Sequence, residues 1–176
     1  MILLNSALQA TLYRAHTPRW ASMPTSGAGA ARQGGRFNRP GIEALYLSLQ
    51  VTTALQEYQQ TSPFLPPCTL CAYEVRLNGL VDVRQLSDPV PWDALWQQWR
   101  DDWRQARFEQ HREPASWVLS DQVRAAGHRG IVFPSLVVAE GVNVVVYNDR
   151  LDADNWVRVL DPTHELPSNQ RSWQKL

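Results

Sequence analysis

The sequence predicts an α+β protein in which several short strands and three helices form a single domain. Its 176 residues suit one domain with a substantial hydrophobic core. Residues 142–147 are almost continuously apolar, which is typical of a strand buried on both faces. Residues 51–58 instead place apolar side chains at i, i+3, i+4 and i+7, the spacing of one helix face. Segments of both kinds follow one another along the chain, without an internal repeat.

The composition excludes several classes of protein. With 44% hydrophobic and 19% charged residues, the chain has the composition of an ordinary globular protein. The formal net charge is zero, so we expect no direct binding to nucleic acid or to an anionic membrane. No apolar run approaches the roughly 20 residues of a membrane span, and residues 1–6 make a poor signal peptide. We therefore expect a cytoplasmic protein.

Positive charge is concentrated near the N-terminus. Residues 1–42 contain no Asp or Glu. The same stretch holds five arginines, namely Arg14, Arg19, Arg32, Arg36 and Arg39. A guanidinium group matches the geometry of phosphate oxygens and stays charged at any working pH. Because acidic neighbours are missing here, the pattern favours an anionic ligand, the alternative being ordinary surface arginines.

The first half of the chain is expected to hold two strands and one helix. Residues 12–16 and 45–48 predict short strands, and residues 17–35 predict a long loop rich in Pro, Gly, Ser and Ala. Residues 49–61 predict a helix, with Glu57 at the flank of its buried face. That face comprises Val51, Ala54, Leu55 and Tyr58.

Two further helices are expected in the second half. A tryptophan-rich helix is predicted over residues 92–106, with an apolar face of Trp92, Leu95, Trp96, Trp99, Trp103 and Ala106. Such a face is typical of a core or a partner interface, although tryptophans can also stack on bases or sugars. The next helix is expected to be capped by Ser116 and ended by Gly127. Its core face would comprise Val118, Leu119, Val123 and Ala126.

Strands account for most of the remaining second half. Residues 69–83 predict one or two strands, and residues 131–133, 142–147 and 156–160 predict one each. The only cysteine pair, Cys68–Cys71, precedes a strand-like run, and no second pair completes a metal site. We therefore expect two reduced, mostly buried thiols and no bound metal.

Four side chains in the first half suggest the chemistry of a site. Arg14 and Arg36 could bind phosphate oxygens, and the Gly34–Gly35 step allows close approach of a ligand to the backbone. Tyr46 could stack on a planar heterocycle, or be a core aromatic. Glu57 could stabilise a developing oxocarbenium ion, or bond a ribose hydroxyl. A single carboxylate does not support the glycosidase scheme with two carboxylates. It suffices for an N-glycosidic bond with a cationic leaving group, which needs no general acid.

The order of these motifs resembles the RES-domain family, named after an arginine, a glutamate and a serine. The resemblance runs over about residues 11–150 and is carried by the segments 13–14, 34–38, 45–48, Glu57, 126–135 and 141–143. Phe37 stands where tryptophan is common in the family. The resemblance implies a domain over residues 1–150, followed by a C-terminal extension over 151–176. It also implies a fold like that of ADP-ribosyltransferases, with split mixed β-sheets and flanking helices.

The same resemblance implies a toxin that consumes NAD and is neutralised by an antitoxin. Members cleave the nicotinamide–ribose bond by hydrolysis or phosphorolysis, or transfer ADP-ribose to a protein. The expected partner is an Xre-type helix-turn-helix antitoxin. Carried over to this chain, Arg14 and Arg36 would bind the pyrophosphate, with Tyr46 stacked on nicotinamide. Glu57 would stabilise the ribosyl cation, while Ser135 would order the site and Asn143 would contribute to NAD binding.

Three other functions stay open at the level of sequence. The first is transfer of ADP-ribose to a protein target. The second is a non-catalytic module that binds a nucleotide through its arginines without turnover. The third is an interaction protein built around the tryptophan-rich helix.

Overall fold

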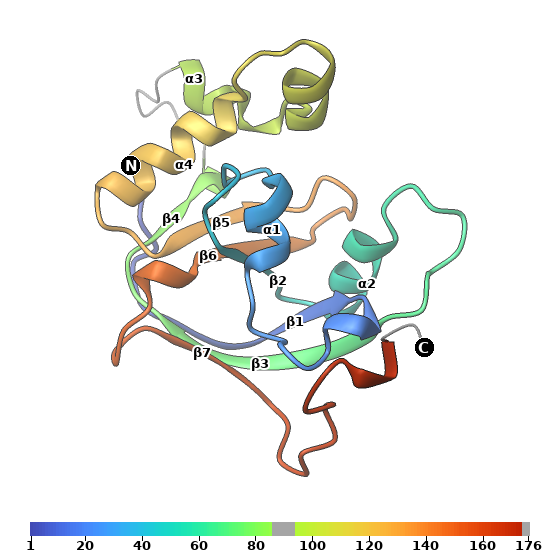
Figure 1. Ribbon diagram of the computed structural model, residues 1–176. Coiled ribbons are helices and arrows are strands. Elements are labelled where there is room, and N and C mark those ends of the chain that lie inside the picture. The colour runs from blue at the N-terminus through green and yellow to red at the C-terminus, as the bar shows by residue number, and fades with distance from the viewer. Residues whose placement is uncertain (86–93, 174–176) are drawn as a thin grey trace.

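A single seven-stranded sheet forms the centre of the computed structural model, which describes residues 1–85 and 94–173 (Figure 1). The strand order is β4-β5-β6-β2-β1-β3-β7, and every neighbouring pair is antiparallel except β4–β5. The strands are β1 Leu8–His16, β2 Ala44–Ser48, β3 Thr69–Leu77, β4 Leu80–Asp82, β5 Gly130–Pro134, β6 Val142–Tyr147 and β7 Trp156–Val159. The α+β class is thereby confirmed, and each expected strand is present.

The two halves of the sheet meet at a narrow join. Between β1 and β2 the only registered pair is Tyr13 with Ser48, whereas β1 pairs with β3 over nine residues. The split sheets that we expected are therefore one continuous sheet with a weak seam in its middle. Because few hydrogen bonds cross this seam, side chains from β1 and β2 can line a space between the halves.

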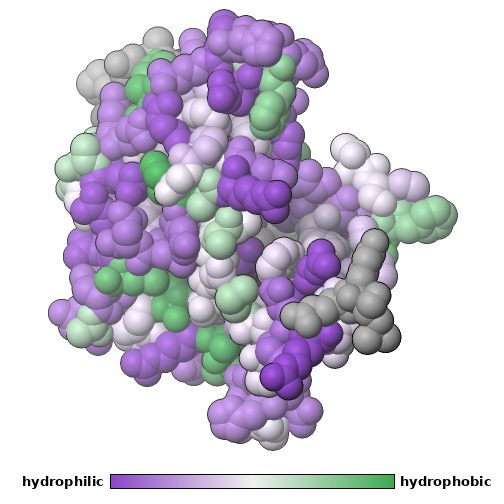
Figure 2. Space-filling view, viewed as in Figure 1, coloured by the Kyte–Doolittle hydropathy of each residue, from purple (hydrophilic) through white to green (hydrophobic). Residues whose placement is uncertain are grey.

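Most helices lie on one side of this sheet, as Figure 1 shows. The α-helices are α1 Ala28–Gln33, α2 Val51–Gln59, α3 Ala94–Gln97 and α4 Ala115–Ala125. The segment 17–35, expected to be a loop, contains α1 and the 3-10 turn η1 Pro18–Trp20. The loop between α2 and β3 projects from the body, and Figure 2 shows a hydrophobic tip there. Phe64 in this loop is 79% exposed.

The buried face of α2 differs from the expected one. Val51 is 37% exposed, whereas Thr53 and Ala54 are buried. Glu57 lies one helical turn beyond both of these residues and therefore shares their face, which turns it toward the sheet. The glutamate thus belongs to the inner face of the helix rather than to its flank.

The prediction of one long tryptophan-rich helix is wrong. The described part of this segment consists of α3, the 3-10 turn η3 Gln98–Arg100 and the π-helical turn η4 Gln105–Glu109, and Trp92 lies outside the described residues. The Asp102 carboxylate accepts hydrogen bonds from the backbone N–H groups of Arg104 and Gln105, and so competes with a continuous helix. Trp96, Trp99 and Trp103 are all buried, so they belong to the core.

Helix α4 begins two residues earlier than expected. Pro114 occupies its N-cap position, while Ser116 is buried within the first turn. Leu119 and Val123 form the buried face as predicted, although Ala126 is exposed. The chain leaves the helix at Gly127, whose φ of 81° is the left-handed conformation that glycine tolerates at a helix end.

Hydrophobic side chains pack against both faces of the sheet. One cluster includes Ile131, Val145 and Tyr147 together with Leu119 from α4. The other includes Val132 and other strand residues of the opposite face. Alternate residues of β5 and β6 thus enter different clusters, which confirms the predicted burial of β6 on both faces and shows the same for β5.

Both cysteines are free, as expected. Cys71 is buried and Cys68 is half-buried. Among the described residues, no group of three or more potential metal-binding side chains is found. Likewise, no described helix has the length and apolar character that crossing a membrane would require.

A buried histidine beside Cys71 makes stability depend on pH. The Nε2 atom of His16 lies 3.6 Å from the Cys71 sulfur. Burial, and secondarily the Arg14 charge, lower the pKa of His16 below its ordinary value of 6.5. Below that value the unfolded chain binds a proton that folded His16 resists, so falling pH favours unfolding.

We therefore expect the free energy of unfolding to fall less in His16→Gln than in the parent between about pH 7 and about pH 5. Urea titrations at several pH values would measure both slopes. His128, whose pKa is also lowered, is present in both proteins and does not affect the comparison. Parallel pH profiles would contradict the prediction.

Candidate active site

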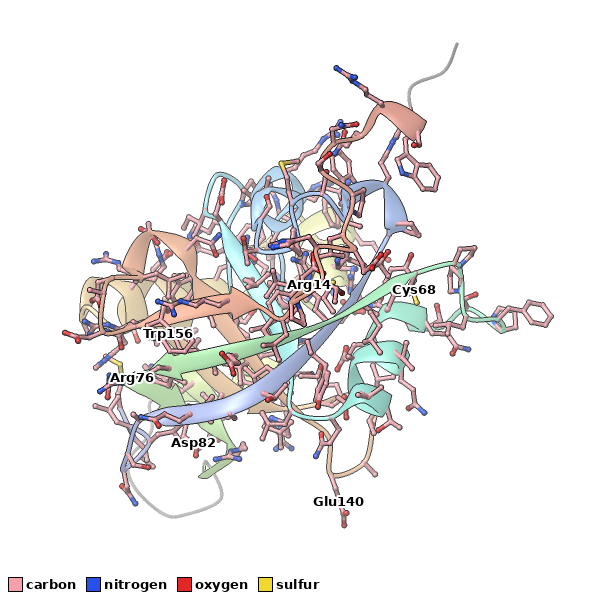
Figure 3. The ribbon with its side chains drawn as sticks, turned by 90° about the horizontal axis from the view of Figure 1, so that it is seen from below. Arg14, Cys68, Arg76, Asp82, Glu140 and Trp156 are labelled. Atoms are coloured by element: carbon pink, nitrogen blue, oxygen red, sulfur yellow. The ribbon has the colours of Figure 1, made fainter. Side chains whose placement is uncertain are left out.

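A cleft of about 730 Å³ opens at the seam between β1 and β2. Its lining includes all of the sequence-predicted site residues except Ser135, namely Arg14, Arg36, Tyr46, Glu57 and Asn143. These come from β1, from the segment after α1, from β2, α2 and β6, respectively. In Figure 3, Arg14 lies near the centre of the molecule, whereas Arg76 lies toward one end of the sheet.

Glu57 is held on one carboxylate oxygen by two side chains distant in sequence. Its Oε1 accepts hydrogen bonds from Ser135 Oγ at 2.7 Å and from Asn143 Nδ2 at 2.6 Å. Within the described part of the chain, Oε2 has no hydrogen bond to the protein. The carboxylate is therefore oriented by its Oε1 atom, and Oε2 remains for a ligand.

Both residues that hold Glu57 are themselves fixed. Ser48 Oγ donates to Asn143 Oδ1 at 2.7 Å, which orients the amide so that its nitrogen faces Glu57. Ser135 Oγ accepts the backbone N–H groups of Val137 and Val138 at 3.0 and 2.9 Å. The only hydroxyl proton of Ser135 is thus committed to Glu57, an arrangement that suits a positioning residue rather than a nucleophile.

Arg14 is tethered to the segment that leads into α1. Its Nη1 donates to the carbonyl oxygens of Pro24 and Ser26 at 3.2 and 3.1 Å. Burial lowers the pKa of Arg14, but an arginine remains charged in a protein. No described residue forms an ion pair with it, so its charge faces the cleft without a neutralising carboxylate.

Arg36 is held in a similar way by the tryptophan-rich segment. Its Nη1 donates to the carbonyl oxygens of Trp99 and Asp101 at 2.9 and 2.8 Å. Burial lowers the pKa of this guanidinium as well. Trp99 is 1% exposed and packs against Phe37 with ring centroids 5.7 Å apart. The interrupted helix thereby positions Arg36, a role that its hydrophobic pattern does not indicate.

Tyr46 contributes both a hydrogen-bonding hydroxyl and a cleft wall. Its hydroxyl accepts the Phe37 N–H at 2.9 Å and donates to Asn38 Oδ1 at 2.8 Å. Burial raises the pKa of Tyr46 far above its ordinary value, so the hydroxyl stays protonated. The Tyr46 ring also lines the cleft. The Tyr46 hydroxyl is thus satisfied within the protein, as expected of a core aromatic. Its ring lines the cleft, as expected of a site residue.

Gly35 is necessary for this arrangement because no room exists for a side chain. A Cβ atom at this position would lie 2.6 Å from both Tyr46 Oη and Asn38 Oδ1. The same residue accepts a hydrogen bond from Trp117 Nε1 at 2.8 Å through its carbonyl oxygen. The close approach expected at Gly34–Gly35 is thus made by protein atoms that shape the cleft.

Gly35→Ala is expected to displace Tyr46, destabilise the protein by about 1–3 kcal/mol and lower any activity of the cleft by about tenfold or more. Urea unfolding and a turnover assay would measure the two effects. Gly29→Ala is the matched control for stability, because a Cβ there meets no atom within 4 Å. Wild-type stability and activity in Gly35→Ala would contradict the tight packing described here.

Three residues that support the site were not predicted from the sequence to have a role in it. Ser48 orients Asn143, Asn38 holds the Tyr46 hydroxyl, and Trp99 holds Arg36. The sequence does offer a signal for Ser48, because it is a polar residue at the end of an apolar strand. For the Trp99 carbonyl no sequence signal exists, because any residue supplies a backbone carbonyl.

The fold and the cleft define an α+β protein in which a held carboxylate and two arginines line one cleft at a sheet seam. The sequence model of the RES domain matches residues 11–169, and the chain therefore belongs to the RES domain family. The match includes β7. No curated protein matches the chain.

A solved structure with a similar fold is the crystal structure of the M. tuberculosis MbcT–MbcA toxin–antitoxin complex. The similar chain has 21% sequence identity, and the TM-score is 0.58. The match covers 89% of the present chain and 84% of the other. At this identity the similarity shows the fold alone, and it agrees with the expected fold class.

Proposed function

We propose that this RES-domain protein cleaves the nicotinamide–ribose bond of NAD. The observation that carries the proposal is the Glu57 carboxylate, fixed through Oε1 by Ser135 and Asn143, in a cleft lined by Arg14 and Arg36. A fixed negative charge in one cleft with positively charged groups suits a ligand that is anionic in one part and in which a positive charge moves onto the ribose during reaction. NAD during glycosidic cleavage is such a ligand.

The chemistry requires few groups from the protein. When the bond between C1′ and the nicotinamide nitrogen breaks, its electron pair goes to the ring nitrogen, and the cationic ring leaves as neutral nicotinamide. No proton needs to be supplied to this leaving group. Positive charge develops on C1′ and the ribose oxygen, where the free Oε2 of Glu57 would stabilise it. Water or phosphate then bonds to C1′ and loses its proton to solvent.

The other cleft residues would orient the dinucleotide. Arg14 and Arg36 bind the pyrophosphate. Each is already immobilised through Nη1, so its side chain loses little further conformational entropy when the ligand binds. Tyr46 packs against the nicotinamide ring, and Asn143 and Ser135 keep Glu57 in place. The cleft volume of about 730 Å³ lies in the range typical of small-molecule sites.

The biological role that we propose is that of a toxin that depletes NAD in the cytoplasm and is neutralised by an Xre-type helix-turn-helix antitoxin. Membership of the RES domain family supports this role, as does the fold shared with a chain of a toxin–antitoxin complex. The roles given to individual residues are those that the family resemblance implies, and the shared cleft lining supports them.

The proposal is tested by incubating the purified protein with NAD and measuring free nicotinamide by chromatography, with and without phosphate. ADP-ribose as the second product indicates hydrolysis, and ADP-ribose-1-phosphate indicates phosphorolysis. Radiolabel from the adenosine half on a protein would instead indicate ADP-ribosyl transfer. Absence of nicotinamide release under all of these conditions would refute NAD cleavage.

A further inference from the structure

A second cleft of about 670 Å³ adjoins the candidate active site. The two clefts share Arg14, Ala15, Gln33 and Tyr58, so Arg14 lies at the boundary between them. The second cleft extends from the end of β1 over the η1 turn and along α1. A ligand whose charged middle lies at Arg14 could therefore occupy both clefts.

The lining of the second cleft combines apolar surface with positive charge. Trp20 and Met23 are 47% and 49% exposed, although large apolar side chains are usually buried. Arg32 joins Arg14 as a second guanidinium, and no described residue of the cleft lining is an Asp or Glu. An indole ring and a thioether are suitable contacts for a flat purine.

Arg32 has no partner within the residues that the structure describes. Neither a hydrogen bond nor an ion pair involves its guanidinium there, in contrast to Arg39, which pairs with Glu113 and Asp121. Its position near the end of α1 places it on the same short helix as Gln33, which lines both clefts. The uncompensated charge of Arg32 is thus available to an anionic group in the second cleft.

We propose that the second cleft binds the adenosine half of the dinucleotide and that Arg32 recognises a phosphate on the ribose 2′ position, so that NADP is preferred to NAD. This inference rests on the proposed function. The pyrophosphate lies at Arg14, nicotinamide riboside extends toward Glu57, and the purine contacts Trp20 and Met23. A 2′-phosphate carries between one and two negative charges near neutral pH and pairs well with a guanidinium fork.

The first test compares the kinetics of nicotinamide release from NADP and from NAD. Because Arg32 is exposed, we expect a preference of only about tenfold for NADP, expressed in KM rather than in kcat. Arg32→Ala should remove this preference, so that the ratio of kcat/KM for NADP to kcat/KM for NAD falls to about one. Arg76→Ala, an exposed arginine elsewhere on the sheet, is the matched control and should retain the preference (Figure 3).

A second test does not require turnover. Calorimetry would compare the binding of adenosine 2′,5′-bisphosphate and of 5′-AMP to the parent, Arg32→Ala and Arg76→Ala proteins. Tighter binding of the bisphosphate by about tenfold, lost only in Arg32→Ala, would support the inference even if no dinucleotide were cleaved. Equal affinities for the two nucleotides, or equal kinetics with NAD and NADP, would overturn it while leaving NAD cleavage standing.

Discussion

Replacing Glu57 with glutamine is expected to slow nicotinamide release by about a thousandfold without unfolding the protein. Glutamine has the size of glutamate, and its Oε1 can still accept the hydrogen bonds from Ser135 and Asn143. The substitution therefore removes the negative charge and little else. Because the charge is needed most in the transition state, the loss should fall on kcat more than on KM.

The measurement is steady-state release of nicotinamide by the parent and Glu57→Gln proteins, with thermal unfolding as a check on the fold. Glu74→Gln is the matched control, since Glu74 is an exposed glutamate of β3 that does not line the cleft. It should retain the parent rate. If Glu57→Gln were as active as the parent, Glu57 would not be the stabilising carboxylate, whatever the products.

Gly130→Ala is expected to be the most damaging single substitution for stability, with a loss of more than about 4 kcal/mol. A Cβ at this position would lie 1.9 Å from the carbonyl oxygen of Val145, a backbone atom of the neighbouring strand. Gly130 is buried and pairs with Leu80 on one side and Val146 on the other. The clash therefore cannot be relieved without separating β5 from β4 or β6.

Urea unfolding would measure this loss if the variant is soluble, and the yield of soluble protein would report it otherwise. Gly29→Ala again serves as the control, because it adds a methyl group to an open position in α1 and should not destabilise the protein. A stable, soluble Gly130→Ala protein would show that the spacing between β5 and β6 is wider than described.

Strands were predictable along this chain because burial on a sheet leaves a local signature. The apolar run at 142–147 coincides with β6, and the runs near 45–48 and 131–133 match β2 and β5 to within a residue at either end.

Helices were less predictable. The spacing of tryptophans over 92–106 indicates one helix, but the Asp102 carboxylate binds nearby N–H groups and interrupts it. Similarly, hydrophobic spacing alone misplaces the inner face of α2, which packing on the sheet turns toward Thr53 and Glu57.

The fold class, the family and the chemical character of the candidate site could be inferred without coordinates, because they depend on residue types, on their order and on short-range patterns. Arginines without acidic neighbours and a single glutamate on a helix are visible without coordinates. The folded structure was needed to show how Glu57 is held, since Ser135 and Asn143 lie 78 and 86 residues away along the chain. The folded structure was likewise needed to show that backbone carbonyls immobilise Arg14 and Arg36. Such contacts carry no signal in the sequence, because every residue has a carbonyl and only the path of the chain brings it to a particular guanidinium.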